Sequence, residues 1–207
     1  MRGGDEVSEK QVMTGGEGEC CGQGVDKLCS DCDWVGMDWH GAFAEYMEIP
    51  ARSVVPLAAG ISIPHAGVTE AAAAVVHAMR LTQRALTQPL AETRALVIGG
   101  GAIGLLTVLV LRAWGCRHIT LAETNALRAE AAERYTGCVS INPMETRIVE
   151  SSHELVVDAV GAAATRQTAI QAVKPGGVVM HIGLQAWDSE IDMRKITLGE
   201  ITLLGTY

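Results

Sequence analysis

A glycine-rich turn between a strand and a helix is the part of the sequence whose residue types and spacing best fit a chemical task. Residues Gly99–Gly104 match the pattern G-x-G-x-x-G, after the apolar run Ala95–Ile98 and at the start of the apolar run Ala102–Trp114. In this setting the glycines permit a sharp turn, let a phosphate approach the backbone, and allow the helix to pack closely on the sheet. The N–H groups and the dipole at the start of the helix favour an anion. Glycine-rich loops are often only tight turns, but the context predicts a dinucleotide site at Gly99, Gly101, Ala102, Ile103 and Gly104.

An acidic residue follows at the spacing that such a site uses. Glu123 ends the next apolar run, 19 residues after Gly104. A carboxylate there can accept hydrogen bonds from the adenosine ribose and repel a 2′-phosphate, which favours NAD over NADP. A solvated acid at the end of a strand is the other interpretation. Arg128 either pairs with a 2′-phosphate, which would favour NADP, or lies flat on the adenine.

Strands and helices alternate after residue 60, as they must to bring the turn and the carboxylate to one edge of a sheet. The predicted strands are 95–98, 118–122, 139–141, 155–158, 178–182 and 201–205, and the predicted helices are 65–85, 102–114, 125–135 and 164–173. Helix 102–114 is apolar nearly all round, which predicts burial, and Lys174–Gly177 predicts a stop and a turn. Six strands separated by helices pair in parallel with right-handed crossovers, which predicts an α/β, doubly wound Rossmann sheet.

Composition limits the class of protein. The chain has 207 residues, of which 48% are apolar, so it can bury a core. A net charge of -8 without a basic stretch argues against nucleic acid as a partner. The run Ala95–Leu111 carries no charge but contains three consecutive glycines, so it is interpreted as a strand, a turn and a helix rather than a membrane span. The polar start shows no secretory signal, which predicts a cytoplasmic protein.

The first part of the chain differs from the rest in its glycine, acidic residues and cysteines. This difference predicts two domains, 1–60 and 61–207. Four of the six cysteines cluster in the first domain, at Cys20, Cys21, Cys29 and Cys32. A disulfide framework is not expected without a secretory signal. The cluster therefore predicts a metal site or the remnant of one.

Six segments together resemble one enzyme family in their order and spacing. They are Gly41–Tyr46, Val55–Pro64, Glu70–Arg80, Asp158–Gly161, Lys174–Leu184 and Glu200–Gly205. Each segment is only moderately specific, but the set resembles the zinc-containing medium-chain dehydrogenase/reductase family, and within it the polyol and threonine dehydrogenase branch. The resemblance covers nearly the whole chain. It implies that Gly41–Tyr46 is a strand at the end of a mostly-β, GroES-like catalytic domain, of which only part precedes the cofactor domain.

The resemblance also implies an activity and its partners. It implies NAD-dependent, reversible oxidation of a secondary alcohol, with a small-molecule alcohol or polyol as substrate and zinc as a Lewis acid. It places five residues along the nicotinamide, namely Val160, Gly161, Gly183, Leu184 and Thr206. It also implies a homodimer or tetramer through strand 201–205, whose apolar edge would otherwise be exposed.

The chain contains only some of the positions that bind zinc in the family it resembles. In the family the first catalytic-zinc ligands precede a Gly-Asp-x-Val segment that Gly4–Val7 resembles, so they fall outside this chain, as does the segment that follows the sixth strand. Glu70 occupies the position of the remaining residue of that site, or else it is a helix-start carboxylate that faces the dipole. The four structural-zinc positions fall on Gly15, Gly18, Cys21 and Cys29, where neighbouring thiols either complete a ligand set or stay free.

These observations leave two main functions open. The first is an oxidoreductase of the zinc alcohol or polyol dehydrogenase type, of which this chain alone is expected to be inactive. The second is a non-catalytic NAD-binding fragment or degenerate homologue. A methyltransferase or other nucleotide-binding Rossmann protein is a third option, but the cysteine cluster and the helix of Glu70 have no place in it.

Overall fold

The structure, a computed structural model, describes residues 5–16 and 18–207. It divides into two compact units, unit 1 ending at Glu70 and unit 2 formed by Ala71–Tyr207. The sequence analysis places the division after residue 60. Gly4, the first residue of the segment Gly4–Val7, lies outside the described residues.

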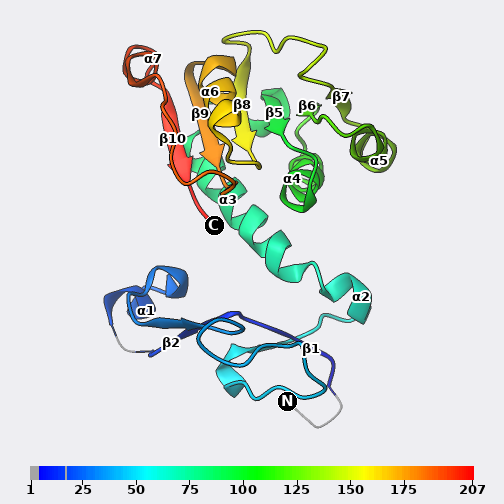
Figure 1. The fold of residues 1–207 in the computed structure, drawn as a ribbon, viewed down its shortest axis with the longest axis vertical. Coiled ribbons are helices and arrows are strands. Elements are labelled where there is room, and N and C mark those ends of the chain that lie inside the picture. The colour runs from blue at the N-terminus through cyan, green and yellow to red at the C-terminus, as the bar shows by residue number, and fades with distance from the viewer. Residues whose placement is uncertain (1–4, 17) are drawn as a thin grey trace. The chain divides into compact units, whose positions relative to one another are not determined.

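Unit 1 is built from short antiparallel strand pairs and single helical turns (Figure 1). β1 (Val7–Glu9) pairs with β4 (Val54–Pro56), and β2 (Val12–Thr14) pairs with β3 (Cys32–Trp34). The helical turns are α1 (Glu19–Gly22), the 3-10 turns η1 (Asp26–Leu28) and η2 (Ala51–Ser53), and α2 (Ile63–Ala66). Unit 1 therefore combines two small antiparallel strand pairs with short helical turns.

The strand predicted at Gly41–Tyr46 is wrong for this structure. Residues 42–45 form bends, and the side chains of Phe43 and Tyr46 are 112% and 90% exposed. An extended segment becomes a strand only when a neighbour takes up its N–H and C=O groups. Within the described ranges no strand pairs with this segment.

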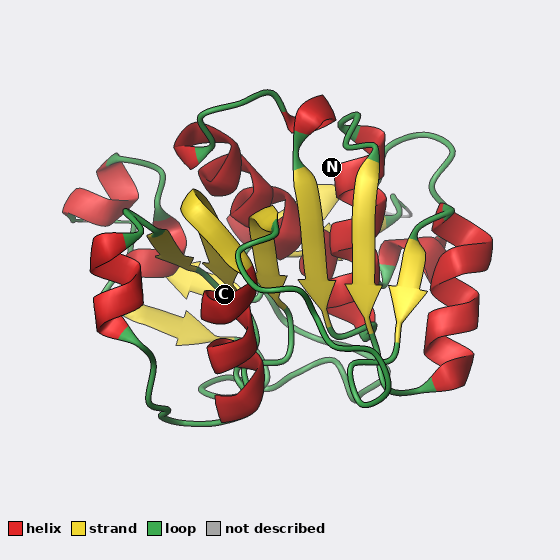
Figure 2. Ribbon diagram, turned by 90° about the horizontal axis from the view of Figure 1, so that it is seen from above, coloured by secondary structure: helices red, strands yellow, loops and turns green. Residues whose placement is uncertain are grey.

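Unit 2 is a parallel sheet of six strands with helices between them (Figures 1 and 2). Its elements are α3 (Thr69–Ala85, which begins at the end of unit 1), η3 (Leu90–Glu92), β5 (Arg94–Ile98), α4 (Ala102–Ala113), β6 (His118–Ala122), α5 (Ala126–Thr136), β7 (Val139–Ile141), β8 (His153–Asp158), α6 (Ala163–Ala172), β9 (Val173–His181), α7 (Met193–Leu198) and β10 (Thr202–Gly205). The strand order is β10-β9-β8-β5-β6-β7, and every neighbouring pair is parallel. The chain runs outward from β5 to one edge and then from β8 to the other, which confirms the predicted doubly wound fold.

Both faces of this sheet are covered by helices. Along β5, Ala95 and Val97 face a core shared with α3, α4 and α5, while Leu96 and Ile98 face a core shared with α6. Burial on two faces explains why the strands read as continuous apolar runs instead of alternating ones. All six strands end at the same edge, where doubly wound sheets bind their ligands.

The helix predicted over 65–85 is divided in two. α2 ends at Ala66 and α3 begins at Thr69, with Gly67 at the end of the first helix. Glycine has a weak helix propensity because it loses more backbone entropy than other residues. The alanine-rich pattern predicts the second helix correctly but does not mark this break.

The turn predicted at Lys174–Gly177 lies inside a strand. β9 begins at Val173, and its ladder with β8 is irregular, since His153 pairs with Val173 but Leu155 pairs with Val178. Gly176, at φ 72°, accommodates the extra residues. The Pro-Gly-Gly signal therefore marks a bulge within the strand and not its beginning.

Helix α4 is buried on one face only, which corrects the prediction that it is buried all round. Gly104, Thr107, Val108 and Leu111 are buried, whereas Leu109 is 40% exposed.

In the described part of the chain, no helix has both the length and the apolar character needed to cross a membrane.

Glu154 joins three strands at the amino edge of the sheet. Its carboxylate accepts hydrogen bonds from the backbone N–H of Arg94 at 2.8 Å, from Nη2 of Arg94 at 2.8 Å and from Nζ of Lys174 at 2.6 Å. Burial raises the pKa of Glu154, but the hydrogen bonds from Arg94 and Lys174 outweigh it and bring the pKa to about 2. The carboxylate therefore ties β5, β8 and β9 together in its charged form.

Replacing Glu154 with glutamine is expected to lower the free energy of unfolding at pH 7 by about 1–2 kcal/mol, after allowance for solvent screening of the half-exposed Arg94. Because the folded pKa is depressed, this stability is present above the ordinary glutamate pKa and is lost as pH falls toward about 2. Urea unfolding at several pH values checks the prediction. The control is Glu130→Gln, which replaces an exposed acid. The prediction would be contradicted if Glu154→Gln lowered the free energy of unfolding equally at pH 7 and at pH 3.

Candidate functional site

The glycine turn connects the end of β5 to the start of α4. Gly99 has φ 94°, and a Cβ added there would overlap the side chain of Val160. A Cβ added at Gly104 would overlap the carbonyl oxygen of Gly99, whereas one added at Gly101 would meet no atom within 4 Å. Packing within the fold thus requires the first and third glycines. The second faces open space at the start of α4, where the first-turn N–H groups have no partner within the helix.

Glu123 is buried beside this turn and holds it to the next helix. The residue is 7% exposed. Its Oε2 accepts the N–H of Gly100 at 2.6 Å, and its Oε1 accepts the N–H of Asn125 at 2.7 Å. Burial raises the pKa of Glu123, but the N–H groups of Asn125 and Gly100 outweigh it, so the pKa lies below its ordinary value. The site therefore keeps a negative charge where β5 and β6 end.

The start of α5 lies next to this carboxylate. Asn125 is the N-cap, and its side chain accepts the N–H of Arg128 at 3.1 Å. The charge of Arg128 contributes to the low pKa of Glu123. Arg128 therefore lies close enough to Glu123 for its positive charge to stabilise the carboxylate.

The loops after β8 and β9 touch each other through two glycines. Gly161 has φ 76°, and a Cβ added there would overlap the carbonyl of Gly183. A Cβ added at Gly183 would overlap the backbone of Val160. The loops are also joined by hydrogen bonds, from the N–H of Ala186 to the oxygen of Gly161 at 2.9 Å and from the N–H of Gln185 to the oxygen of Val160 at 3.1 Å.

The remaining predicted residues lie on the same edge of the sheet. Leu184, which follows β9, is 75% exposed. Thr206, which follows β10, donates its N–H to the oxygen of His181 at 3.1 Å. The residues predicted to contact a dinucleotide are thus brought to the carboxyl ends of five strands, although they come from five separate parts of the chain.

A fully buried carboxylate organises the two touching loops. Asp158 accepts the N–H of Val160 at 3.0 Å, the N–H of Gly161 at 2.9 Å and the hydroxyl of Thr165 at 3.2 Å. Nδ1 of His181 lies 3.3 Å from its Oδ2. Burial raises the pKa of Asp158, but the hydrogen bonds from His181, Gly161 and Val160 outweigh it and the pKa lies below its ordinary value.

The sequence analysis missed the pairing of Asp158 with His181. The two residues are 23 positions apart in the sequence, but β8 and β9 are neighbours and their register places Asp158 opposite His181. A signal was present, because both residues are polar and each follows an apolar run, Leu155–Val157 and Val178–Met180. Only the strand order shows that they meet.

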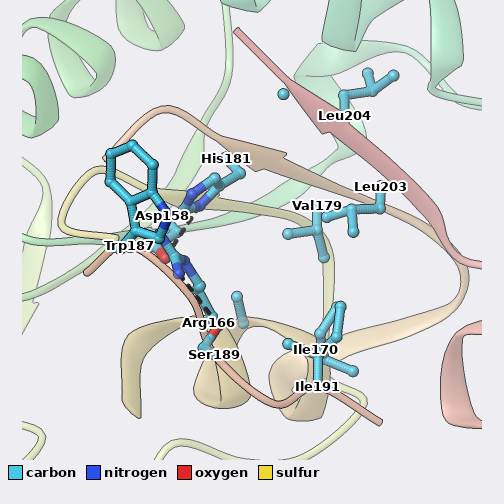
Figure 3. A pocket seen from close by; sticks show the side chains of 12 residues that line it. Asp158, Arg166, Ile170, Val179, His181, Trp187, Ser189, Ile191, Leu203 and Leu204 are labelled. Atoms are coloured by element: carbon cyan, nitrogen blue, oxygen red, sulfur yellow. Dashed lines mark hydrogen bonds and ion pairs between the residues drawn. The ribbon is translucent and has the colours of Figure 1, made fainter. Parts of the chain in front are cut away.

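A cavity of about 350 Å³ lies on the α6 face of the sheet, next to edge strand β10 (Figure 3). Ile170, Val179 and Leu203 contribute apolar walls, and the Asp158–His181 pair forms part of the polar wall. Arg166 also lines the cavity, and its guanidinium donates a hydrogen bond to the hydroxyl of Ser189 at 3.2 Å. No residue of the glycine turn lines the cavity, so it is separate from that site.

The candidate metal ligands do not form a complete site. Glu70 is exposed in the first turn of α3. Cys21 and Cys29 have their sulfur atoms 3.6 Å apart. Over residues 5–16 and 18–207, no group of three or more His, Cys, Asp or Glu side chains is placed to hold a metal ion. A structural zinc needs four protein ligands and a catalytic zinc three, so the described residues do not fit the metal at either place.

The strand order and the glycine turn define unit 2 as a doubly wound Rossmann fold. A family profile described as zinc-binding dehydrogenase matches residues 102–207. The chain belongs to this family of zinc-binding dehydrogenases.

Dehydrogenases are among the proteins that are similar to this chain. L-threonine 3-dehydrogenase of Shewanella pealeana is 27% identical over 212 residues, which cover 99% of this chain and 60% of that protein. A protein of Sinorhizobium meliloti 1021 solved with NADP has a TM-score of 0.89 and 24% identity, and covers 100% of this chain and 63% of its own. An alcohol dehydrogenase of Escherichia coli CFT073 solved with NADH has a TM-score of 0.88 and 23% identity, with 98% and 61% covered. The chain thus spans about 60% of the length of its relatives.

Proposed function

We propose that unit 2 binds NAD(H) along the carboxyl edge of its sheet, and that the chain is the cofactor-binding part of a zinc-type alcohol or polyol dehydrogenase. The observation that carries this proposal is the buried carboxylate of Glu123, which lies within 2.6 Å of the backbone of the glycine turn. One charged group thus adjoins both the open start of α4, where a pyrophosphate binds, and the end of β6, where a ribose binds.

The second half of the cofactor would lie along the touching loops after β8 and β9. Val160, Gly161, Gly183, Leu184 and Thr206 would then face the nicotinamide, which accepts a hydride from the carbon of a secondary alcohol. The work of these residues is to orient the ring and to exclude water. No metal-dependent step is assigned to this chain, because its described residues do not form a metal site.

Native chain is expected to bind NADH at micromolar levels and NADPH at least roughly tenfold more weakly, since the charge of Glu123 opposes a 2′-phosphate. Relatives of this fold were solved with NADP in one case and NADH in another, so the fold alone does not decide the cofactor. Glu123→Gln is expected to weaken NADH binding roughly 10–100-fold through loss of charged hydrogen bonds to the ribose. Calorimetric titration measures both effects.

The control is Glu130→Gln, an exposed acid on the neighbouring helix α5, which should bind NADH like the native chain. Circular dichroism shows whether the Glu123 variant is folded. Tighter binding of NADPH than of NADH would reject the assignment of Glu123. Failure of both to bind the folded native chain would reject the proposed function.

The second candidate is a protein that binds NAD without oxidising an alcohol. It is favoured by Gly15 and Gly18, which stand at two of the four structural-zinc positions and have no side chain to bind a metal. The two candidates are separated by the reading frame that precedes the chain, where a cysteine and a Gly-His-Glu segment upstream of Gly4 would favour the dehydrogenase. This chain alone is expected to form no NADH from sorbitol, threonine or a simple alcohol with added zinc, and measurable formation would reject the second candidate.

We also propose that two chains associate through β10, in a dimer or tetramer. β10 is an edge strand, and Leu203 on it is 44% exposed, which leaves an apolar edge open to pairing. Light scattering at about 50 μM is expected to show an oligomer, since stable pairs form well below that level. Leu203→Lys should give a monomer, whereas Val139→Lys on β7, the opposite edge strand, should not. A native monomer would contradict the proposal.

A further inference from the structure

Unit 1 holds two thiols in contact where the family resemblance implies a metal. The sulfur of Cys21 lies 3.6 Å from that of Cys29. The two other positions implied for ligands carry Gly15 and Gly18, which have no side chain to donate. Two thiols in contact are a dithiol, and the oxidation state of a dithiol is set by exchange with other thiols and disulfides.

The backbone between these cysteines is already folded so that they meet. The N–H of Gly24 donates to the oxygen of Cys21 at 3.1 Å, and the N–H of Cys29 donates to the oxygen of Asp26 at 3.0 Å. These turns close a short loop without a long-range rearrangement. Both cysteines are partly exposed, whereas Cys116 and Cys138 are buried. Cys20 and Cys32 are equally exposed, so a small thiol reagent can reach all four cysteines of unit 1 but not Cys116 and Cys138.

We propose that Cys21 and Cys29 form a reversible disulfide, with a small-molecule disulfide such as oxidised glutathione as the oxidant. One cysteine attacks a sulfur of oxidised glutathione, which forms a mixed disulfide and releases one glutathione thiol. The second cysteine then attacks the protein sulfur of this mixed disulfide and releases the second glutathione. The two protein thiols lose two electrons and two protons, and glutathione disulfide gains both as two thiols. This site does not depend on cofactor binding by unit 2.

Cys20 and Cys32 are the other cysteines of unit 1 that could enter a disulfide with Cys21 or Cys29. Cys20 is adjacent to Cys21, and neighbouring residues rarely suit the geometry of a disulfide. Cys32 interacts electrostatically with Cys29 and is therefore the nearer competitor. The sulfur contact that the structure records joins Cys21 to Cys29.

Tryptic mapping of the full chain tests the proposal. Cleavage after Lys10, Lys27 and Arg52 puts Cys21 in peptide 11–27 and Cys29 in peptide 28–52. After equilibration with oxidised glutathione and alkylation, the two peptides are expected to be linked, and reduction should separate them. A bond between Cys29 and Cys32 would instead lie within peptide 28–52 and would overturn the proposal.

Serine variants and metal analysis complete the test. Cys21→Ser and Cys29→Ser should each abolish the link between the peptides, whereas the matched Cys20→Ser and Cys32→Ser should retain it, with circular dichroism showing that all four are folded. Loss of the link in Cys32→Ser with its retention in Cys29→Ser would overturn the proposal. Chain purified without chelator should contain less than about 0.2 zinc per molecule. One zinc per chain that is lost in Cys21→Ser, or unlinked peptides from the native chain, would overturn the proposal.

Discussion

Replacing Gly161 with alanine is expected to destabilise unit 2 by about 3 kcal/mol and to abolish tight NADH binding. Two costs add. Gly161 has φ 76°, a conformation that is unfavourable for residues with a Cβ. The added Cβ would also overlap the carbonyl of Gly183, so the loops after β8 and β9 would have to separate. Urea unfolding followed by far-UV circular dichroism, which reports mainly the helices of unit 2, measures the loss.

Gly176→Ala is the matched control for this prediction. Gly176 has φ 72°, nearly the same as Gly161, but a Cβ added there meets no atom within 4 Å. The control therefore has the backbone cost of about 1–2 kcal/mol without the clash. It should bind NADH like the native chain. Equal losses in the two variants would show that the contact between the loops does not matter.

Replacing Asp158 with alanine is expected to cost about 3 kcal/mol, because it leaves buried donors without an acceptor. The backbone N–H groups of Val160 and Gly161, the hydroxyl of Thr165 and the ring of His181 all lose the same partner. The loops that Asp158 holds together would loosen. NADH binding should therefore weaken more than binding of ADP-ribose, which lacks the nicotinamide.

The control is Asp192→Ala, which removes an exposed N-cap that accepts the N–H of Lys195 at 2.9 Å and should cost about 1 kcal/mol. Acid gives a second readout. Because the pKa of folded Asp158 lies below its ordinary value, its contribution is full above that ordinary value and is lost as pH falls through the folded one. The difference in the free energy of unfolding between the native chain and Asp158→Asn should therefore become smaller in acid. A difference that does not change with pH would contradict the role assigned to Asp158.

The cofactor half of the fold could be predicted from sequence because its signals are local. Burial on both faces makes each parallel strand a short apolar run, as in β6, which matches the predicted 118–122. A turn and a cap leave equally local marks, such as Gly99–Gly104 and Asn125. The predicted number of strands and their alternation with helices then leave few possible topologies.

The errors occur where a local signal has more than one structural solution. Lys174–Gly177 looks like a turn between elements, yet β8 extends to His153 and pairs with that stretch, which makes it a bulge in β9. Helix α7 was not predicted, since its six residues are too few for a periodic pattern. The resemblance to the family predicts a strand at Gly41–Tyr46, but a segment forms a strand only when a neighbouring strand pairs with it.

By itself the sequence determined the fold class, the position of the glycine turn and the acid that follows it, because these depend on residues close together in the chain. Only the tertiary structure decided which distant residues meet. Asp158 lies beside His181, Gly161 contacts Gly183, and Cys21 contacts Cys29. The physical reason is that such contacts depend on strand order, register and loop closure, which no short stretch of sequence specifies.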